Sequence, residues 1–434
     1  MVRWCLAWTT RISLVLVAMA PLLPAAVLVP QSQAVRCGLT RAWYAQVGSL
    51  QSTGPVNHIH YFEGVVLAQT TGGMLTALDA ETGRSLWARQ VGPRGRWTSE
   101  AAANKDYVAV INGSRLHALE RLTGVELWNR QLVGVPGAGP AVSETYAFVP
   151  MIDGRVEGYA LDGSTRFSPW VYKSAGDVLN SPMTTPQTVS WTTELGYFYV
   201  ADPNGDGVRY RLETNDPIHA RPGYWTPNLY AGSLNGFVYA VDEASARIHW
   251  KFSIGDPIDE PPVAIQSNVF VTSRTRGMTC LDAEAARELW VAPGIARFLA
   301  AGASRLYAVD RVGQLVVLDI ATGTRLASMP LVDVAITLTN PHSDRIYLVG
   351  ATGAVQCLHE LRQQTPVLHV PPAPHVIEKP KLRDRSDAPV EETPPETTPE
   401  STPSPEGEPS DSPFSEENPV TPAEPDADDP FATP

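Results

Sequence analysis

Short apolar runs of about six residues recur along the chain, and each is followed by a polar turn and an alternating segment. In the clearest copy, apolar residues between Gly73 and Leu78 precede the turn at residues 79–83, and the alternating segment after it contains Trp87. A continuous apolar run without helical spacing predicts a buried strand, and alternation predicts a half-buried one. An Asp at the start of the turn and a Gly at its end predict a tight connection between the two strands.

This unit repeats with a nearly fixed period. The position of Asp79 recurs at Glu120, Asp162, Asp202, Asp242, Asp282, Asp319 and His359, in steps of 37, 40, 41 or 42 residues. Such a period in a strand-rich sequence is typical of β-propellers. The last copy lacks an outer strand, whereas residues 41–47 look like an outer strand that no repeat precedes. We therefore predict an all-β fold over residues 38–362, an eight-bladed propeller of four-stranded antiparallel blades whose N-terminal strand closes the ring.

Six tryptophans fall in or near the same slot of the outer strand: Trp43, Trp87, Trp128, Trp170, Trp250 and Trp290. Copy seven has Ala327 in this slot, and copy four has no tryptophan there. An indole buries roughly 150–250 Å² and needs one partner for its N–H group. We predict that these side chains dock structurally between blades and do not bind substrate.

The N-terminal residues 1–34 are typical of an export signal. Arg3 and Arg11 precede an apolar run over residues 12–29, and Ser32-Gln33-Ala34 offers a cleavage site of small residues. An uncleaved membrane anchor is the alternative, because the run approaches spanning length. Arg36 precedes Cys37 where a lipoprotein signal has a small residue, so lipid attachment is not predicted. We expect a periplasmic or cell-envelope protein.

Residues 363–434 predict a disordered acidic tail rich in Pro, Glu, Thr and Ser. From Pro371 onward the chain has 17 of its 39 prolines, and 16 acidic against four basic residues give −12 of the net charge of −13. Such a segment cannot bury enough apolar surface to offset its ordering entropy. The remaining propeller is nearly neutral, which argues against nucleic acid as a partner.

One loop has the spacing of a calcium site. Asp202, Asn204, Asp206, Gly207 and Glu213 fit the pattern D-x-[DN]-x-[DN]-G-x5-E, in which oxygen atoms surround Ca²⁺. The flanking segments are predicted strands, so the alternative is a polar hairpin turn. In that case the second strand would carry Glu213 away from the other oxygen atoms.

Two other pairs of residues invite chemical interpretations. His58 and His60 share one face of a predicted strand, which suits two-point metal binding, but no third ligand is evident and a surface strand is the simpler interpretation. Cys37 lies just before the predicted closing strand and Cys357 lies in the blade that this strand would complete, so a disulfide between them is an alternative to free thiols. Cys280 occupies a small buried strand position.

The pattern Leu-Asp-x-x-Thr-Gly-x-x-x-Trp resembles the PQQ-like propeller repeats, a family that includes quinoprotein alcohol dehydrogenases and outer-membrane assembly lipoproteins of the BamB type. The assembly proteins imply a non-enzymatic scaffold within a larger envelope complex. The dehydrogenases imply a PQQ cofactor held by adjacent cysteines and a calcium ion. This chain has no Cys-Cys pair and lacks long inserted loops. We therefore expect no enzyme activity, no PQQ and no resident cofactor, with Ca²⁺ at the loop above as the alternative.

The expected partners are envelope proteins or peptides, bound by a monomeric propeller through loops on one face or at the channel mouth. Peripheral association with a membrane is compatible with this picture. The alternatives are a PQQ-dependent dehydrogenase-like enzyme and a module that binds polymers or surfaces. Arg96, Trp97, Tyr224 and Trp225 lie between predicted strands, and each is either an exposed contact residue or packed locally.

Overall fold

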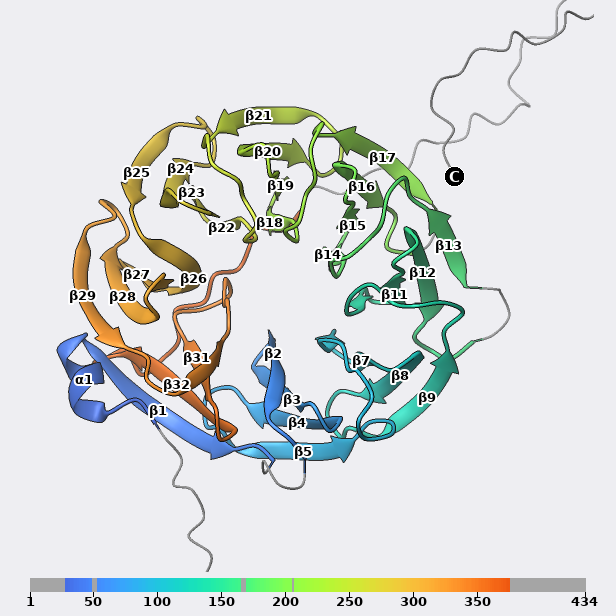
Figure 1. The fold of residues 1–434 in the computed structure, drawn as a ribbon, viewed down its shortest axis with the longest axis horizontal. Helices are drawn as coiled ribbons and strands as arrows, with labels where there is room; N and C mark the ends of the chain where they lie inside the picture. The colour runs from blue at the N-terminus through green and yellow to red at the C-terminus, as the bar shows by residue number, and fades with distance from the viewer. Residues whose placement is uncertain (1–27, 49–52, 165–168, 205–206, 375–434) are drawn as a thin grey trace, which may run out of the picture. The chain divides into compact units, whose positions relative to one another are not determined.

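The structure, a computed structural model, describes residues 28–48, 53–164, 169–204 and 207–374. The chain divides into one unit up to Glu378 and a second, Lys379–Pro434, that lies outside the described residues. Eight four-stranded antiparallel sheets are arranged in a ring (Figure 1), which confirms the predicted propeller. Within the described ranges, no helix is long and apolar enough to cross a membrane.

The first four blades follow one another in the chain, and each runs from an inner to an outer strand. Blade 1 consists of β2 (Val56–Phe62), β3 (Val65–Thr70), β4 (Met74–Asp79) and β5 (Ser85–Gln90), and blade 2 of β6 (Ala102–Ala103), β7 (Tyr107–Asn112), β8 (Arg115–Glu120) and β9 (Glu126–Gln131). Blade 3 consists of β10 (Ala141–Val142), β11 (Tyr146–Pro150), β12 (Arg155–Ala160) and β13 (Trp170–Lys173), and blade 4 of β14 (Met183–Thr184), β15 (Val189–Thr192), β16 (Tyr197–Ala201) and β17 (Val208–Glu213).

The remaining blades continue the same order, except that the last one is completed from the N-terminus. Blade 5 consists of β18 (Gly223–Trp225), β19 (Asn228–Gly232), β20 (Phe237–Asp242) and β21 (Ile248–Ser253), and blade 6 of β22 (Val263–Ile265), β23 (Asn268–Ser273), β24 (Gly277–Asp282) and β25 (Glu288–Ala292). Blade 7 consists of β26 (Ile295–Ala301), β27 (Arg305–Asp310), β28 (Gln314–Asp319) and β29 (Arg325–Pro330), and blade 8 of β30 (Val334–Thr337), β31 (Ile346–Gly350), β32 (Ala354–Glu360) and β1 (Leu39–Gln46).

The ring closes as predicted, through the N-terminal strand. β1 pairs with β32 from Leu39 opposite Glu360 to Gln46 opposite Ala354. The short helix α1 (Gln31–Arg36) precedes β1. Val29 and Ala34 are buried in an apolar cluster shared with blades 7 and 8. The packed part of the propeller therefore begins before residue 38, inside the segment that we assigned to the export signal.

Five of the repeated tryptophans join their blade to the next through one hydrogen bond. The indole N–H of Trp87 donates to the backbone oxygen of Arg121 at 2.7 Å, in the turn of the following blade. A Cβ atom added at Gly124 would lie 2.5 Å from the Trp87 ring, so only glycine leaves the ring its space. The same donation is made by Trp43 to Ala80, Trp128 to Leu161, Trp250 to Ala283 and Trp290 to Ile320.

Blade 4 fills the docking slot with a residue that the sequence analysis missed. Tyr210 stands opposite Val200, as Trp87 stands opposite Ala77 in blade 1. The Tyr210 hydroxyl lies 3.2 and 3.1 Å from the backbone oxygens of Asp242 and Glu243, in the turn of blade 5. Trp170 also stands in the slot, within an aromatic cluster of blades 3 and 4 that includes Trp191.

The segment after the last blade remains on the propeller. We name residues 363–374 the C-terminal strap. Leu368 forms an isolated bridge with Ser343, and the backbone N–H of Val367 donates to the carboxylate of Asp344 at 3.0 Å. Residues 367–369 of the predicted disordered tail are therefore bonded to the propeller, whereas residues 375–434 lie outside the described part of the chain.

Candidate functional site

The antiparallel order of the strands divides the loops between two faces. The loop that enters each blade and the hairpin between its second and third strands lie at the same end of the blade; we call this side the entry face. The repeated Asp turns and the connections between first and second strands lie at the other end; we call this side the Asp-turn face.

Exposed apolar side chains gather on the entry face of three consecutive blades. We name them the entry-face patch: Trp97, Val133, Val135, Ile152, Leu179 and Leu195. Each is between 42 and 75% exposed. They come from the loops that enter blades 2, 3 and 4 and from the hairpins of blades 3 and 4. Several exposed apolar side chains on neighbouring loops of one face are typical of binding sites.

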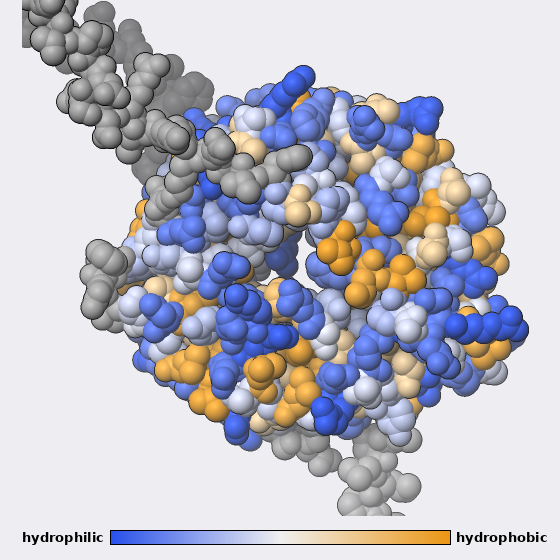
Figure 2. Space-filling view, turned by 180° about the vertical axis from the view of Figure 1, so that it is seen from behind, coloured by the Kyte–Doolittle hydropathy of each residue, from blue (hydrophilic) through white to orange (hydrophobic). Residues whose placement is uncertain are grey.

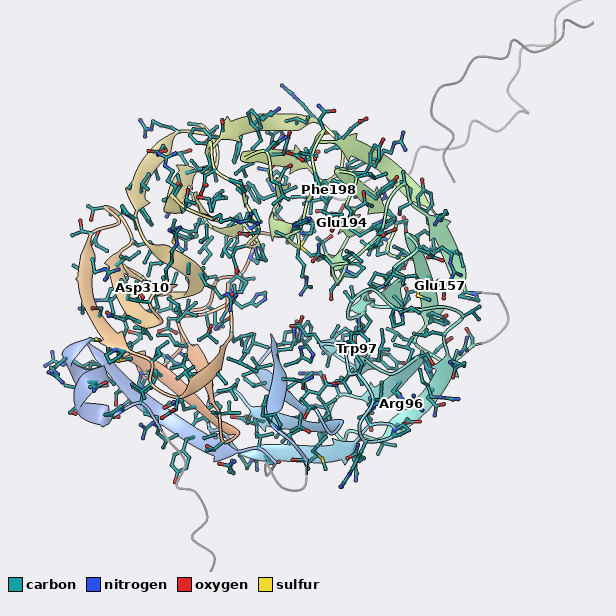
Figure 3. The ribbon with its side chains drawn as sticks, in the orientation of Figure 1. Arg96, Trp97, Glu157, Glu194, Phe198 and Asp310 are labelled. Atoms are coloured by element: carbon teal, nitrogen blue, oxygen red, sulfur yellow. The ribbon has the colours of Figure 1, made fainter. Side chains whose placement is uncertain are left out.

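Backbone hydrogen bonds hold the loops of the patch against their own blades. The N–H of Gly113 donates to the carbonyl of Trp97 at 2.7 Å, and the N–H of Ile152 donates to that of Val135 at 3.0 Å. In blade 4 the N–H of Glu194 donates to the carbonyl of Asp177 at 3.1 Å. The patch thus stands on fixed loops, and Figure 3 shows Trp97 and Glu194 at the inner parts of their blades.

Charged side chains border the patch. The Arg155 guanidinium lies 2.8 Å from the carboxylate of Asp153 and 2.7 Å from that of Glu157, and it donates to the carbonyl of Val133 at 2.8 Å. His219 lies 2.8 Å from Glu194. An apolar centre with a charged margin is the usual anatomy of a protein–protein interface.

Charged groups on the inner strands and on the loops that enter them are already paired. Glu100 lies 3.5 Å from His60 and 3.9 Å from Arg221, so one carboxylate links side chains from blades 1 and 5. Burial alone would raise the pKa of Glu100, but the hydrogen bond with His60 and the charge of Arg221 lower it to about 2. Arg297 and Glu260 form a further pair at 3.0 Å. These pairings leave less charge to attract an ionic ligand.

The predicted calcium ligands are only partly brought together. Asp202 accepts hydrogen bonds from the backbone of Asn204 and from Arg209, each at 2.9 Å. Glu213 stands opposite Tyr197, at the far end of the hairpin from Asp202, so β17 carries it away from the loop. Asp206 lies outside the described residues. Among the residues described, no group of three or more His, Cys, Asp or Glu side chains is arranged to hold a metal ion.

The other candidate residues are separated as well. His58 lies 3.1 Å from the carbonyl of Thr98, whereas His60 faces Glu100. The disulfide alternative is wrong, because Cys37 and Cys357 are free and buried, as is Cys280. Burial raises the pKa of each of the three thiols, and that of Cys280 to about 12.

Of the four candidates predicted to lie between strands, Arg96 and Trp97 do so, whereas Tyr224 and Trp225 lie in β18, so that part of the prediction is wrong. Trp97 is exposed on the entry face, and Arg96 precedes it further from the channel (Figure 3). The Tyr224 hydroxyl lies 2.6 Å from that of Thr226, and Trp225 packs against the cores of blades 5 and 6.

Among the cavities of the described surface are two small ones, with volumes of about 40 and 180 Å³. The larger is lined by Asp106, Tyr107 and Leu122 of blade 2. Each of these two is smaller than a pocket for a drug-sized ligand, which usually measures about 300–1,000 Å³.

Comparison with known proteins agrees with this architecture. Residues 199–333 match the family model described as outer membrane protein assembly factor BamB. The BamB of Yersinia pestis is 22% identical over 309 residues, which cover 67% of this chain and 70% of that protein. The chain resembles the BamB-type propellers of the PQQ-like repeat family. The BamB of Xanthomonas campestris is 34% identical to this BamB-like propeller over 117 residues, covering 25% of this chain and 28% of that protein.

Solved structures support the fold of the BamB-like propeller. BamB from Moraxella catarrhalis superposes with a TM-score of 0.60 at 16% identity, covering 75% of this chain and 98% of that one. Quinohemoprotein alcohol dehydrogenase from Comamonas testosteroni superposes with a TM-score of 0.53 at 13% identity, covering 77% and 79%. At these identities the structures establish the fold alone.

Proposed function

We propose that this chain is an exported, non-enzymatic propeller scaffold that binds another protein of the cell envelope and takes part in outer-membrane protein assembly. The names of its relatives support this proposal, since they are assembly factors of the outer membrane. The observation that carries it is the entry-face patch, because exposed apolar side chains on hydrogen-bonded loops form a prepared contact surface.

Trp97 is the side chain expected to contribute most to binding. Aromatic residues are among the side chains that contribute most to the energetics of interfaces. The aliphatic residues Val135, Ile152 and Leu195 would extend this contact over blades 3 and 4. The partner surface should therefore be apolar, with charged groups complementary to the Arg155 and Glu194 margins.

The proposal is tested by recovery of envelope proteins on the tagged full-length chain after expression in its source cells. Mass spectrometry identifies the proteins recovered with the wild type. The triple variant Trp97→Ser, Val135→Ser, Leu195→Ser should recover at least tenfold less of a named envelope assembly protein. The control variant Ile248→Ser, Leu289→Ser, Leu326→Ser removes exposed aliphatic residues from outer strands and should behave as the wild type.

Equal melting temperatures of the two triple variants establish that both have folded. Equal recovery by the two variants would refute the assignment of the entry face. Reproducible turnover of an alcohol by the purified protein loaded with PQQ would refute the non-enzymatic assignment.

A further inference from the structure

A buried arginine fixes the beginning of the C-terminal strap. The side chain of Arg345 is 2% exposed and lies between the carboxylates of Glu81 and Asp344, at 3.0 and 3.2 Å. Its two terminal nitrogens donate to the backbone oxygens of Gln363 and Gln364, at 3.3 and 2.6 Å. The strap thus leaves the propeller from a defined point on blade 8.

The middle of the strap is bonded to two blades. The backbone N–H of His369 donates to the carbonyl of His342 at 2.8 Å, in the loop between β30 and β31. The imidazole of His369 is buried, and its Nε2 atom lies 2.7 Å from the carbonyl of Ala301 in blade 7. The N–H of Asp344 donates to the carbonyl of Val367 at 3.2 Å.

The far end of the strap reaches the opposite side of the ring. Pro374 lines the 40 Å³ cavity together with Gln187 of blade 4 and Thr226, Pro227 and Ala244 of blade 5. An extended chain rises about 3.1 Å per residue in the polyproline conformation, so the seven steps from Val367 span ~22 Å. Figure 1 shows the orange end of the chain passing along the inner rim toward β18.

The composition of the strap suits this path. Prolines at 371, 372 and 374 have no N–H group to leave unbonded, and their fixed φ lowers the entropy lost on binding. Leu368 and Val370 remain exposed. Figure 2, which views the molecule from behind, shows hydrophobic residues beside the central opening.

We propose that the rim of the Asp-turn face, from blades 7 and 8 to blades 4 and 5, is a binding groove for an extended, proline-containing polypeptide. Its occupant is this chain's own segment, residues 365–374. A second polypeptide can use the groove only by displacing this segment, which leaves the entry face as the open side for partners. This inference does not depend on the proposed assembly function.

Cleavage of the folded, full-length protein tests the groove. A specific protease site is inserted between Gln364 and Thr365 in one variant and between Pro374 and His375 in the matched control. After cutting, the peptide 365–434 should co-elute with the propeller in gel filtration, whereas 375–434 should separate. Substituting His369→Ala in the first variant should speed release about tenfold, because it removes the hydrogen bond to Ala301.

Release of 365–434 as fast as 375–434 would overturn the proposal. Retention of both peptides would overturn it as well, since the acidic tail alone would then account for binding. Gln363 and Gln364 stay on the propeller side of both cuts. Neither cut therefore removes the hydrogen bonds that Arg345 donates to their carbonyls.

Discussion

Replacing Trp87 tests how the blades are held together. The side chain is 7% exposed, and its N–H group donates to the carbonyl of Arg121 in the next blade at 2.7 Å. Trp87→Phe removes this hydrogen bond and part of the ring, whereas Trp87→Ala also leaves a cavity between blades 1 and 2. The two variants therefore separate the polar contribution of the slot from the apolar one.

The expected losses of unfolding free energy follow from these contacts. Loss of the hydrogen bond in Trp87→Phe lowers the unfolding free energy by about 0.5–1.5 kcal/mol. We expect the upper half of that range, because the Arg121 carbonyl is left without its donor. Truncating a buried tryptophan to alanine costs about 3–5 kcal/mol. Trp87→Ala should thus destabilise the protein at least twice as much as Trp87→Phe.

Equilibrium unfolding in guanidinium chloride, followed by far-UV circular dichroism, measures both changes. Trp97→Phe and Trp97→Ala are the matched controls, because this indole is exposed, and each should stay within about 0.5 kcal/mol of the wild type. If Trp87→Ala were as stable as Trp97→Ala, the docking role of the repeated tryptophan would be refuted.

Three further predictions concern the thiols, the calcium loop and the N-terminus. The buried cysteines, whose pKa values are raised, should react with a thiol reagent only after unfolding, and fast labelling of Cys280 in the native protein would contradict their burial. Calcium or a chelator should leave the melting temperature unchanged, because Glu213 lies far from Asp202; a rise of several degrees with millimolar calcium would show that the loop binds it. Since Val29 and Ala34 are buried, the exported chain should begin at or before residue 28, and an intact mass corresponding to a start at residue 35 would show otherwise.

The spacing of the repeats predicted nearly the whole architecture. The turn residue that recurs once per blade predicted the number of blades. Trp43, which no repeat precedes, predicted the ring closure, because a strand without partners in its own repeat must complete another sheet. Tyr210 was not predicted because the docking slot was defined by tryptophan alone. Tyr210 stands opposite Val200, the position that faces the docked tryptophan in the other blades. The register of those blades would therefore have identified it.

The contact surfaces were harder to predict, for physical reasons. The entry-face patch takes one or two residues from each of several loops, so no local stretch of sequence is unusual there. Glu213 fits the linear spacing of a calcium loop, but the extended strand before it carries it away from Asp202, as the hairpin alternative predicted. The composition of the strap predicted disorder. Its packing depends instead on Arg345 and Asp344 in an earlier loop, which the composition of the strap does not reveal.

Photo-crosslinking from the entry face tests the central claim most directly. A photoreactive residue placed at Val135 in the full-length chain should yield a discrete crosslink to an envelope assembly protein in source cells, and one placed at Leu289 on an outer strand should not. A crosslink from Leu289 alone, or none from Val135 while the same partner is recovered with the tagged protein, would show that the partner binds elsewhere.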